Sequence, residues 1–372
     1  KRNPRLCYCC WGHNGMVISN KLEGVMRTLL ITDLHLNSRI PGLLTAQKES
    51  ILKIFKDEEP DEVIIMGDVF MYRKPSPSEL LAFKHISDYM KKKASTTYVL
   101  RGNHDSETKA DDGITSLSLF DEEFKWTGNG IHVIVHSWVD EARKRVFIPH
   151  YENENTIIDA LEMVPEDYTV FGHFGYDGCL NSAGDADFGI PLTHFKSRTF
   201  LGHIHNFSEG QGGLQEPHPT VMCLGTPYTT NYGESFKDNF YAILQPSWDD
   251  ENDCATTEVK LRTPTSGPRH LVYNVEDIEN NLETINDSNF FTFLRVMVGA
   301  NHQTIPYEKL NVAYVDVKYA PVFDEEELSS YSPDGELFSI NEEIISDYVK
   351  SANSTISTDT LMEGYRLLKN ED

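Results

Sequence analysis

Two absences limit what this chain can be. No stretch of its 372 residues stays apolar over the roughly 20 residues that a membrane-spanning helix requires, so we expect no membrane role. The N-terminus has no apolar core of the secretory type, and export is not expected. Cysteine is also scarce, with six residues, which argues against a disulfide framework and favours a reducing compartment such as the cytoplasm.

Positive charge is in short supply as well. The chain has 33 Lys and Arg against 58 Asp and Glu, a formal net charge of −25. This balance argues against a simple basic DNA-binding module. It does not exclude a nuclease, because bound divalent cations bring their own positive charge to a phosphate. The acid is concentrated over 324–372, which is typical of a solvated or partner-binding segment.

The length favours two domains with tails over one compact core. We predict an N-terminal extension, a first domain, a second domain and a helical segment, over 1–25, 26–247, 255–322 and 333–372. A polar stretch over 245–256 is interpreted as the linker. The second domain is predicted to be a small α+β unit, with a helix near 276–285 and strands over 290–298 and 312–319.

The N-terminal extension gathers Cys7, Cys9, Cys10 and His13 within a short span. Neighbouring residues cannot easily converge on one tetrahedral zinc ion. A loose tail with reduced thiols is therefore the simpler interpretation, and a zinc site is the alternative.

From residue 27 the chain alternates apolar strands with helices. Strands are predicted over 28–32, 62–66, 97–100, 131–135, 146–148, 168–171 and 198–201, and helices over 45–57, 77–93 and 155–163. Pro and Ser before residue 77 are helix start signals. The alternation predicts an α/β fold with largely parallel central strands, in which ligands bind beyond the strand carboxyl ends.

Five short motifs follow these strands and supply Asp, Asn and His side chains. They are Asp33-Leu34-His35, Gly67-Asp68, Gly102-Asn103-His104-Asp105, Gly172-His173 and Gly202-His203-Ile204-His205. Each alone is weak, because Gly-Asp and Gly-Asn are common turns. Five in succession, each after an apolar strand, predict a single site.

The residue types in these motifs suit a pair of metal ions. Two divalent ions about 3.5–4 Å apart can clamp a phosphate and provide hydroxide at neutral pH. A carboxylate serves best as the ligand shared by both ions. Mixed oxygen and nitrogen ligands without sulfur suit Mn²⁺, Fe or Zn better than Mg²⁺, and we expect two Mn²⁺ ions.

The five motifs resemble DxH, GD, GNH[DE], GH and GHxH of the calcineurin-like metallophosphoesterase superfamily, over about residues 27–245. Within it the chain is most similar to the SbcD/Mre-eleven nucleases of double-strand-break processing. Residues 67–70 and 73–77 resemble their GDLF and RPSP segment, and residues 225–229 resemble the tailed-phage members. The resemblance implies a four-layer sandwich of mixed β-sheets flanked by helices, with a small capping domain and a helical tail.

The resemblance also implies a role for each residue. The implied metal ligands are Asp33, His35 and His205 for the first ion, Asn103, His173 and His203 for the second, and Asp68 as the bridge. His104 would face the scissile phosphate, and Asp105 would orient His104. Cellular members carry a second active-site His three residues after the bridging Asp, where this chain has Met71.

The function so implied is a two-metal DNA nuclease, the catalytic subunit of an SbcCD-like nuclease–ATPase complex of recombination and repair. Its expected activities are exonuclease on duplex ends and endonuclease on single strands, in the cytoplasm of a bacterium or a phage-infected host. Its implied partners are DNA, an SbcC-like SMC-type ATPase bound by the helical tail, and a second copy contacting the region of 77–93. One alternative is a calcineurin-like phosphodiesterase or phosphatase acting on a small or protein substrate. Another is a non-catalytic scaffold.

Among the histidines outside the motifs, His132, His136 and His194 are interpreted as structural, since a lone strand histidine is usually a hydrogen-bonded one. His150, between Pro149 and Tyr151, is interpreted as a loop residue, and an approach to DNA is the alternative.

Overall fold

The computed structural model describes residues 26–94, 96–121, 130–179, 189–214, 218–249, 254–299 and 304–319. The predicted N-terminal extension and the helical segment over 333–372 lie outside these residues. Within the described part of the chain, every helix is too short or too polar to cross a membrane.

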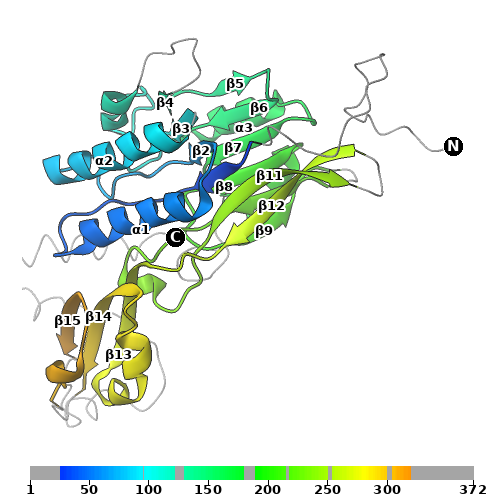
Figure 1. The fold of residues 1–372 in the computed structure, drawn as a ribbon. Coiled ribbons are helices and arrows are strands. Elements are labelled where there is room, and N and C mark those ends of the chain that lie inside the picture. The colour runs from blue at the N-terminus through cyan, green and yellow to red at the C-terminus, as the bar shows by residue number, and fades with distance from the viewer. Residues whose placement is uncertain are drawn as a thin grey trace, which may run out of the picture. The chain divides into compact units, whose positions relative to one another are not determined.

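Two six-stranded mixed sheets make up most of the described chain (Figure 1). The first sheet contains β1 (Thr28–Ile31), β2 (Glu62–Ile65), β3 (Thr96–Leu100), β4 (Gly130–Ile134), β11 (Tyr241–Asp249) and β12 (Cys254–Arg262), in the order β12-β11-β1-β2-β3-β4. The second contains β5 (Trp138–Asp140), β6 (Arg145–Ile148), β7 (Thr169–His173), β8 (Arg198–Gly202), β9 (Ser208–Gln211) and β10 (Thr220–Cys223), in the order β5-β6-β7-β8-β10-β9. Parallel pairs connect β1 to β4 and β6 to β10, and antiparallel strands flank them.

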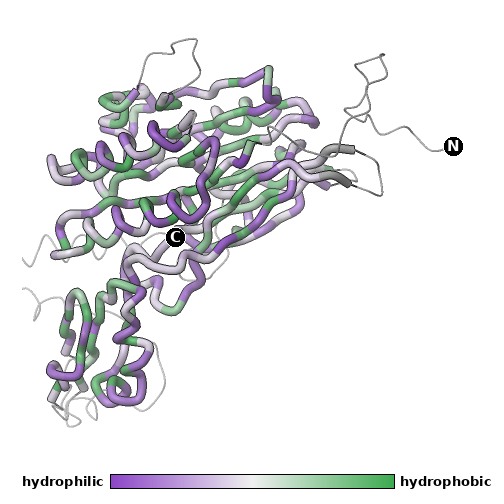
Figure 2. The backbone as a smooth tube through the Cα atoms, in the orientation of Figure 1, coloured by the Kyte–Doolittle hydropathy of each residue, from purple (hydrophilic) through white to green (hydrophobic). Residues whose placement is uncertain are grey.

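Helices cover the outer faces of both sheets, giving four layers. The helices are α1 (Leu43–Glu58) and α2 (Pro77–Lys93) on the first sheet, and α3 (Glu154–Glu162) on the second. Hydrophilic and hydrophobic residues alternate along α1 and α2, as expected for helices that cover a sheet (Figure 2). The predicted mixed α/β sandwich is confirmed.

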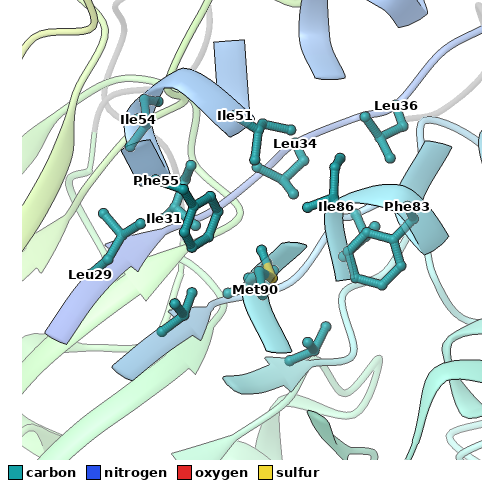
Figure 3. Packing of buried hydrophobic residues seen from close by; sticks show 14 of the residues in the cluster. Leu29, Ile31, Leu34, Leu36, Ile51, Ile54, Phe55, Phe83, Ile86 and Met90 are labelled. Carbon is teal, nitrogen blue, oxygen red and sulfur yellow. The ribbon is translucent and has the colours of Figure 1, made fainter. Parts of the chain in front are cut away.

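The period-two alternation of the strands assigns each side chain to a layer. Leu29 and Ile31 of β1 pack under α1, with Ile51 and Phe55 of that helix (Figure 3). Leu30, between them in sequence, faces the second sheet in a separate cluster. Because β1 is apolar on both faces, it is buried on both sides, as a central parallel strand must be.

The start of α2 links this helix to the loop after β1. The backbone N–H of Glu79 donates to Ser76 Oγ at 3.3 Å, and the backbone N–H of Ser76 donates to Glu79 Oε2 at 2.7 Å. This capping box, with Pro77 in the first turn, explains why the helix begins where the sequence predicted. Glu79 Oε1 also accepts from the backbone N–H of Ser38 at 2.7 Å, which fixes the loop that leaves β1.

The stretch over 245–256 is not a linker, so that prediction is wrong. β11 and β12 pair over nine residues and extend the first sheet at its edge. The polar composition belongs to an edge hairpin, whose outer positions are solvated. A third sheet follows, with strands β13 (Gly267–Asn274), β14 (Phe290–Val298) and β15 (Tyr314–Tyr319), all parallel. The helix predicted near 276–285 is reduced to 3₁₀ turns and the single turn α4 (Leu282–Ile285).

Candidate metal centre

The five motifs come together at one edge of the sandwich. They follow β1, β2 and β3 of the first sheet and end β7 and β8 of the second. The backbone N–H of His203 donates to Asp33 Oδ2 at 2.9 Å, and His173 Nδ1 donates to the Met66 carbonyl oxygen at 2.5 Å. These two bonds join the sheets at the carboxyl ends of their strands, where the sequence predicted the site.

Asp33, His35 and His205 form the first cluster of metal-ligand type. The Nε2 atoms of His35 and His205 each lie 3.7 Å from Asp33 Oδ1 and 2.9 Å from one another. Asp33 Oδ2 is held by Thr32 Oγ1 and by a backbone amide. Oδ1 is buried and has no hydrogen-bond partner among the described residues. A buried anionic oxygen between two imidazole nitrogens suits a cation.

Asp68, Asn103, His173 and His203 form the second cluster. His173 Nε2 lies 3.3 Å from Asp68 Oδ1 and 3.2 Å from Asn103 Oδ1. Asn103 Oδ1 lies 3.0 Å from His203 Nδ1. An amide oxygen, two imidazoles and a carboxylate thus converge without adding a second negative charge.

Asp68 connects the two clusters. Its Oδ1 faces His173, while its Oδ2 lies 3.7 Å from Nε2 of His35 in the first cluster. A carboxylate that presents one oxygen to each cluster has the arrangement of a bridging ligand. The full donor set of two carboxylates, one amide and four imidazoles, without thiolate, fits two divalent cations.

The protonation of the site reflects its buried charges. Burial alone would raise the pKa of Asp33, but the nearby imidazoles of His35, His173 and His205 lower it to about 2. Burial also disfavours charged His173, yet the Asp68 carboxylate outweighs it and raises the pKa of His173 to about 9. Without metal, a proton on imidazole therefore balances the carboxylates, and divalent cations would replace that charge.

Four of the seven candidate ligands have strained backbones. The φ angles are positive at Asp33 (52°), His35 (43°), Asp68 (50°) and His203 (80°). Non-glycine residues rarely adopt this region, and such conformations persist where the surroundings enforce them. The neighbouring Gly102 is needed for close approach, because a Cβ there would lie 2.0 Å from Asp68 Oδ1.

His104 lies beside the first cluster and is not oriented by Asp105. Its Nδ1–H donates to the Met71 carbonyl oxygen at 2.7 Å, and its ring centroid is 4.9 Å from that of His35. The Asp105 carboxylate instead accepts backbone N–H groups of Val69 at 3.3 Å, Phe70 at 3.1 Å and Gly102 at 3.0 Å. The expected pairing of Asp105 with His104 is thus replaced by a backbone contact.

The Asp105 carboxylate is buried beside the Asp68 carboxylate, and both features affect its protonation. Burial and the nearby Asp68 carboxylate raise the pKa of Asp105 to about 6, against the opposing effect of the backbone amides. Asp105 therefore holds together the loops that carry Asp68 and Asn103.

Glu234 is a site residue that sequence reasoning missed. His205 Nδ1 donates to Glu234 Oε1 at 2.5 Å, which turns Nε2 of His205 toward Asp33. Burial opposes the charge of both partners, but their hydrogen bond raises the pKa of His205 and lowers that of Glu234. Glu234 lies in the 3₁₀ turn Tyr232–Glu234, after no apolar strand, and carries no sequence signal of its role.

His150, interpreted from the sequence as a loop residue with an approach to DNA as the alternative, lies beside the second cluster. Its ring centroid lies 5.6 Å from that of His203 and 6.2 Å from that of His173. Burial, reinforced by His173, lowers the pKa of His150 to about 4. The signal that identified the other motifs also applies here, since His150 follows the apolar strand β6.

The three histidines predicted to be structural lie outside the clusters. His132 is buried on β4 with its ring 5.7 Å from that of Tyr98. His194 Nδ1 lies 3.2 Å from Glu162 Oε1, and His136 is exposed.

The match to a protein family agrees with this site. The calcineurin-like phosphoesterase family matches residues 26–240, and the chain belongs to this family of metal-dependent hydrolases. Among the solved structures that match this chain is that of the Pseudomonas putida nuclease MPE. It shares 15% sequence identity at a TM-score of 0.29, covering 62% of this chain and 87% of that one. No curated protein matches the sequence.

Proposed function

We propose that the protein is a two-metal DNA nuclease of the SbcD/Mre-eleven type. One observation carries the proposal: Asp68 faces two adjoining ligand clusters, with His104 beside them. Bound divalent ions, of which Mn²⁺ is our expectation, would provide Lewis acidity and a nucleophile at neutral pH. Asp33, His35 and His205 would hold one ion. Asn103, His173 and His203 would hold the other, and Asp68 would hold both.

His104 would act on the phosphate itself. Because its Nδ1–H is committed to the Met71 carbonyl oxygen, Nε2 is the atom left for the substrate. From there it would donate a proton to the leaving oxygen or stabilise the charge that develops on it. A general acid of this kind contributes about 10²–10⁴-fold to the rate.

Cations on the loops that carry the ligands support a polyanionic substrate. The Arg39 guanidinium lies 3.5 Å from the ring centroid of Tyr72, and exposed Lys74 follows in the same loop. Arg73 donates to the Thr108 carbonyl oxygen at 2.8 Å and pairs with the Glu152 carboxylate at 3.1 Å, which offsets part of its charge. These residues lie on the loops that carry the ligands after β1 and β2, in a chain whose net charge is −25. Phosphate groups of DNA would meet them next to the site.

The finer assignments rest on the resemblance of residues 67–70, 73–77 and 225–229, and on the predicted second domain and helical tail. They are exonuclease action on duplex ends, endonuclease action on single strands, an SbcC-like SMC-type ATPase partner, a homodimer, and a cytoplasmic location in a bacterium or phage-infected host. The ATPase would bring much of the grip on DNA, which suits the acidic composition.

Activity on a panel of substrates tests the reaction. With Mn²⁺, the protein should degrade linear duplex DNA and cut circular single-stranded DNA. Asp68→Asn should abolish cleavage and weaken metal binding. His104→Ala should lower cleavage by about 10²–10⁴-fold and keep the metal. His194→Ala, outside the clusters, should behave like the wild type.

The same panel separates the rival function. If a phosphopeptide or bis-p-nitrophenyl phosphate is hydrolysed while DNA stays intact at high enzyme, with or without an ATPase partner, the substrate is not DNA. Light scattering reports whether the chain is a dimer. A chain ending at residue 320 should lose the ATPase and keep hydrolysis of the small diester.

A further inference from the structure

The ring nitrogens of His150 make no well-formed hydrogen bond to the described residues. Nδ1 and Nε2 are both buried, and the contact that this ring makes with the His173 backbone is too poor in geometry to satisfy either nitrogen. The nearest carboxylate oxygen, Oε1 of Glu152, lies 3.9 Å from Nε2, beyond hydrogen-bond distance. A buried polar group without a partner costs free energy, so its persistence calls for an explanation.

The position of this ring is fixed by the chain on both sides. The backbone N–H of His150 donates to the Arg101 carbonyl oxygen at 2.9 Å, and Arg101 Nη2 donates to the His150 carbonyl oxygen at 2.5 Å. Arg101 is itself buried. The next residue, Tyr151, is buried and its hydroxyl accepts the backbone N–H of Ser137 at 2.8 Å. His150 therefore lies in a loop, as the sequence predicted, but hydrogen bonds hold its backbone in place.

The clamp by Arg101 ties His150 to the candidate metal centre. Arg101 directly precedes Gly102 and Asn103, so the same residue that holds His150 leads into the loop of a candidate ligand. The His150 ring is tilted 34° to that of His203 at 5.6 Å. It belongs to none of the groups whose ligand atoms lie within 4.8 Å of one another. His150 therefore lies next to the candidate metal ligands but is not one of them.

We infer that His150 is a substrate-contacting residue, whose ring nitrogen hydrogen-bonds a phosphate oxygen on the side of the second cluster. His104 lies beside His35 in the first cluster and, unlike His150, is close enough to group with His35 and Asp68. The two non-ligand histidines would contact the phosphate from the two clusters. The inference rests on the proposed function only in that the centre binds a phosphate ester, whatever the rest of the substrate.

Four variants separate this contact from simple packing against His203. His150→Ala removes the ring, and His150→Phe keeps an aromatic ring but removes its nitrogens. His150→Gln replaces the ring with an amide that hydrogen-bonds. His194→Ala is the control for loss of an imidazole elsewhere. Each protein is loaded with Mn²⁺, and metal content is measured by elemental analysis.

Two measurements are made on each variant. They are kcat/KM for bis-p-nitrophenyl phosphate and the binding of inorganic phosphate by calorimetry. We expect His150→Ala and His150→Phe to lower kcat/KM by about 10- to 100-fold, the loss of one hydrogen bond to a charged group. Phosphate affinity should fall in parallel, metal content should stay unchanged, and His150→Gln should recover part of both.

Either of two results would overturn the contact. Phosphate affinity and kcat/KM within twofold of wild type in His150→Phe would show that the ring only packs. Losses that track lower Mn²⁺ content would show that it positions ligands. Phosphate binding does not depend on turnover, so a wild type that binds phosphate but cleaves no diester would refute the proposed function and still decide the role of His150.

Discussion

Glu234 shows how one side chain outside the motifs governs a ligand inside them. Its Oε1 accepts from His205 Nδ1, and its Oε2 accepts the backbone N–H of Thr230 at 2.6 Å. Thr230 Oγ1 and Asn231 Nδ2 donate to the same carboxylate. With four donors around it, the charged carboxylate is stabilised despite burial. Such a partner selects the tautomer and raises the basicity of the metal-binding nitrogen.

Replacing Glu234 by Gln should therefore weaken metal binding without unfolding the site. The amide keeps an acceptor for His205 but loses the charge, and we expect Mn²⁺ affinity to fall by about 10- to 100-fold. Calorimetric titration measures the change. Glu162→Gln is a matched control, since Glu162 meets His194 at 3.2 Å outside the clusters. Equal Mn²⁺ affinity in the two variants would show that Glu234 does not contribute to metal binding.

For single residues, the sequence predicts the candidate metal ligands better than the groups that orient the histidines of the site. The candidate ligands stand directly after apolar strands, and a parallel sheet brings strand ends together. Glu234 and the carbonyl of Met71 reach the site only through the tertiary fold. A backbone carbonyl has no residue type to detect, so the orientation of His104 could not be predicted.

The turn after β3 is packed so closely against Asp68 that Gly102 cannot take a larger side chain without a shift. Gly102→Ala would place a Cβ 2.0 Å from Asp68 Oδ1 and 2.4 Å from the Asp68 backbone nitrogen. Because the backbone cannot move aside cheaply, we expect a loss of about 1–3 kcal/mol in stability. The displaced Asp68 should also lower Mn²⁺ affinity at least tenfold.

A glycine in open space provides the comparison for this substitution. A Cβ at Gly299 meets nothing within 4 Å, so Gly299→Ala should leave both quantities near wild type. Urea unfolding and calorimetry measure them. A Gly102→Ala protein that binds Mn²⁺ normally would show that the loop adapts and that the close approach is not required.

The contact between β13 and the loop after β10 should depend on pH. His270 on β13 is fully buried, and its Nδ1 lies 3.1 Å from both Thr229 Oγ1 and the Thr229 carbonyl oxygen. Burial lowers the pKa of His270 to about 4, from about 6.5 in an unfolded chain. Between those values the unfolded state binds the proton and the folded state does not. Stability from this group is therefore complete above pH 6.5 and is lost as the pH falls toward 4.

His270→Gln removes that titration and keeps a polar side chain. From pH 7 to pH 5 the wild type should lose about 2 kcal/mol more than the variant, because the other titrating groups are common to both. Urea unfolding at the two pH values measures the difference. Parallel losses in the two proteins would mean that His270 takes up its proton without disturbing the fold.

How well each helix or strand could be predicted depends on how clearly the local sequence marks it. α2 matches its prediction because Ser76, Pro77 and Glu79 mark its start in the sequence. The β11–β12 hairpin was misread as a linker because an edge strand needs few apolar residues. The helix expected near 276–285 lacks comparable capping bonds and breaks into short turns.

For the molecule as a whole, charge is the dominant constraint on the proposed binding of DNA. A net charge of −25 repels a polyanion, and the buried carboxylates of Asp33 and Asp68 lie at the centre of the site. Two divalent ions would add four positive charges at that point, where the phosphate is to bind. The metal would then be needed for DNA affinity as well as for cleavage. Cations such as Arg39 would contribute a smaller share.

This dependence is measured in the His104→Ala protein, which should hold metal and DNA without cutting. At a fixed, low ionic strength we expect its affinity for a short duplex to be at least tenfold higher with Mn²⁺ than after chelation, since ions at the phosphate act directly on the contact. Asp68→Asn, lacking the shared ligand, should show little response to Mn²⁺. Equal affinity of His104→Ala with and without metal would place the DNA grip away from the metal centre. The acidic chain would then have to hold DNA through its exposed cations or through the proposed ATPase partner.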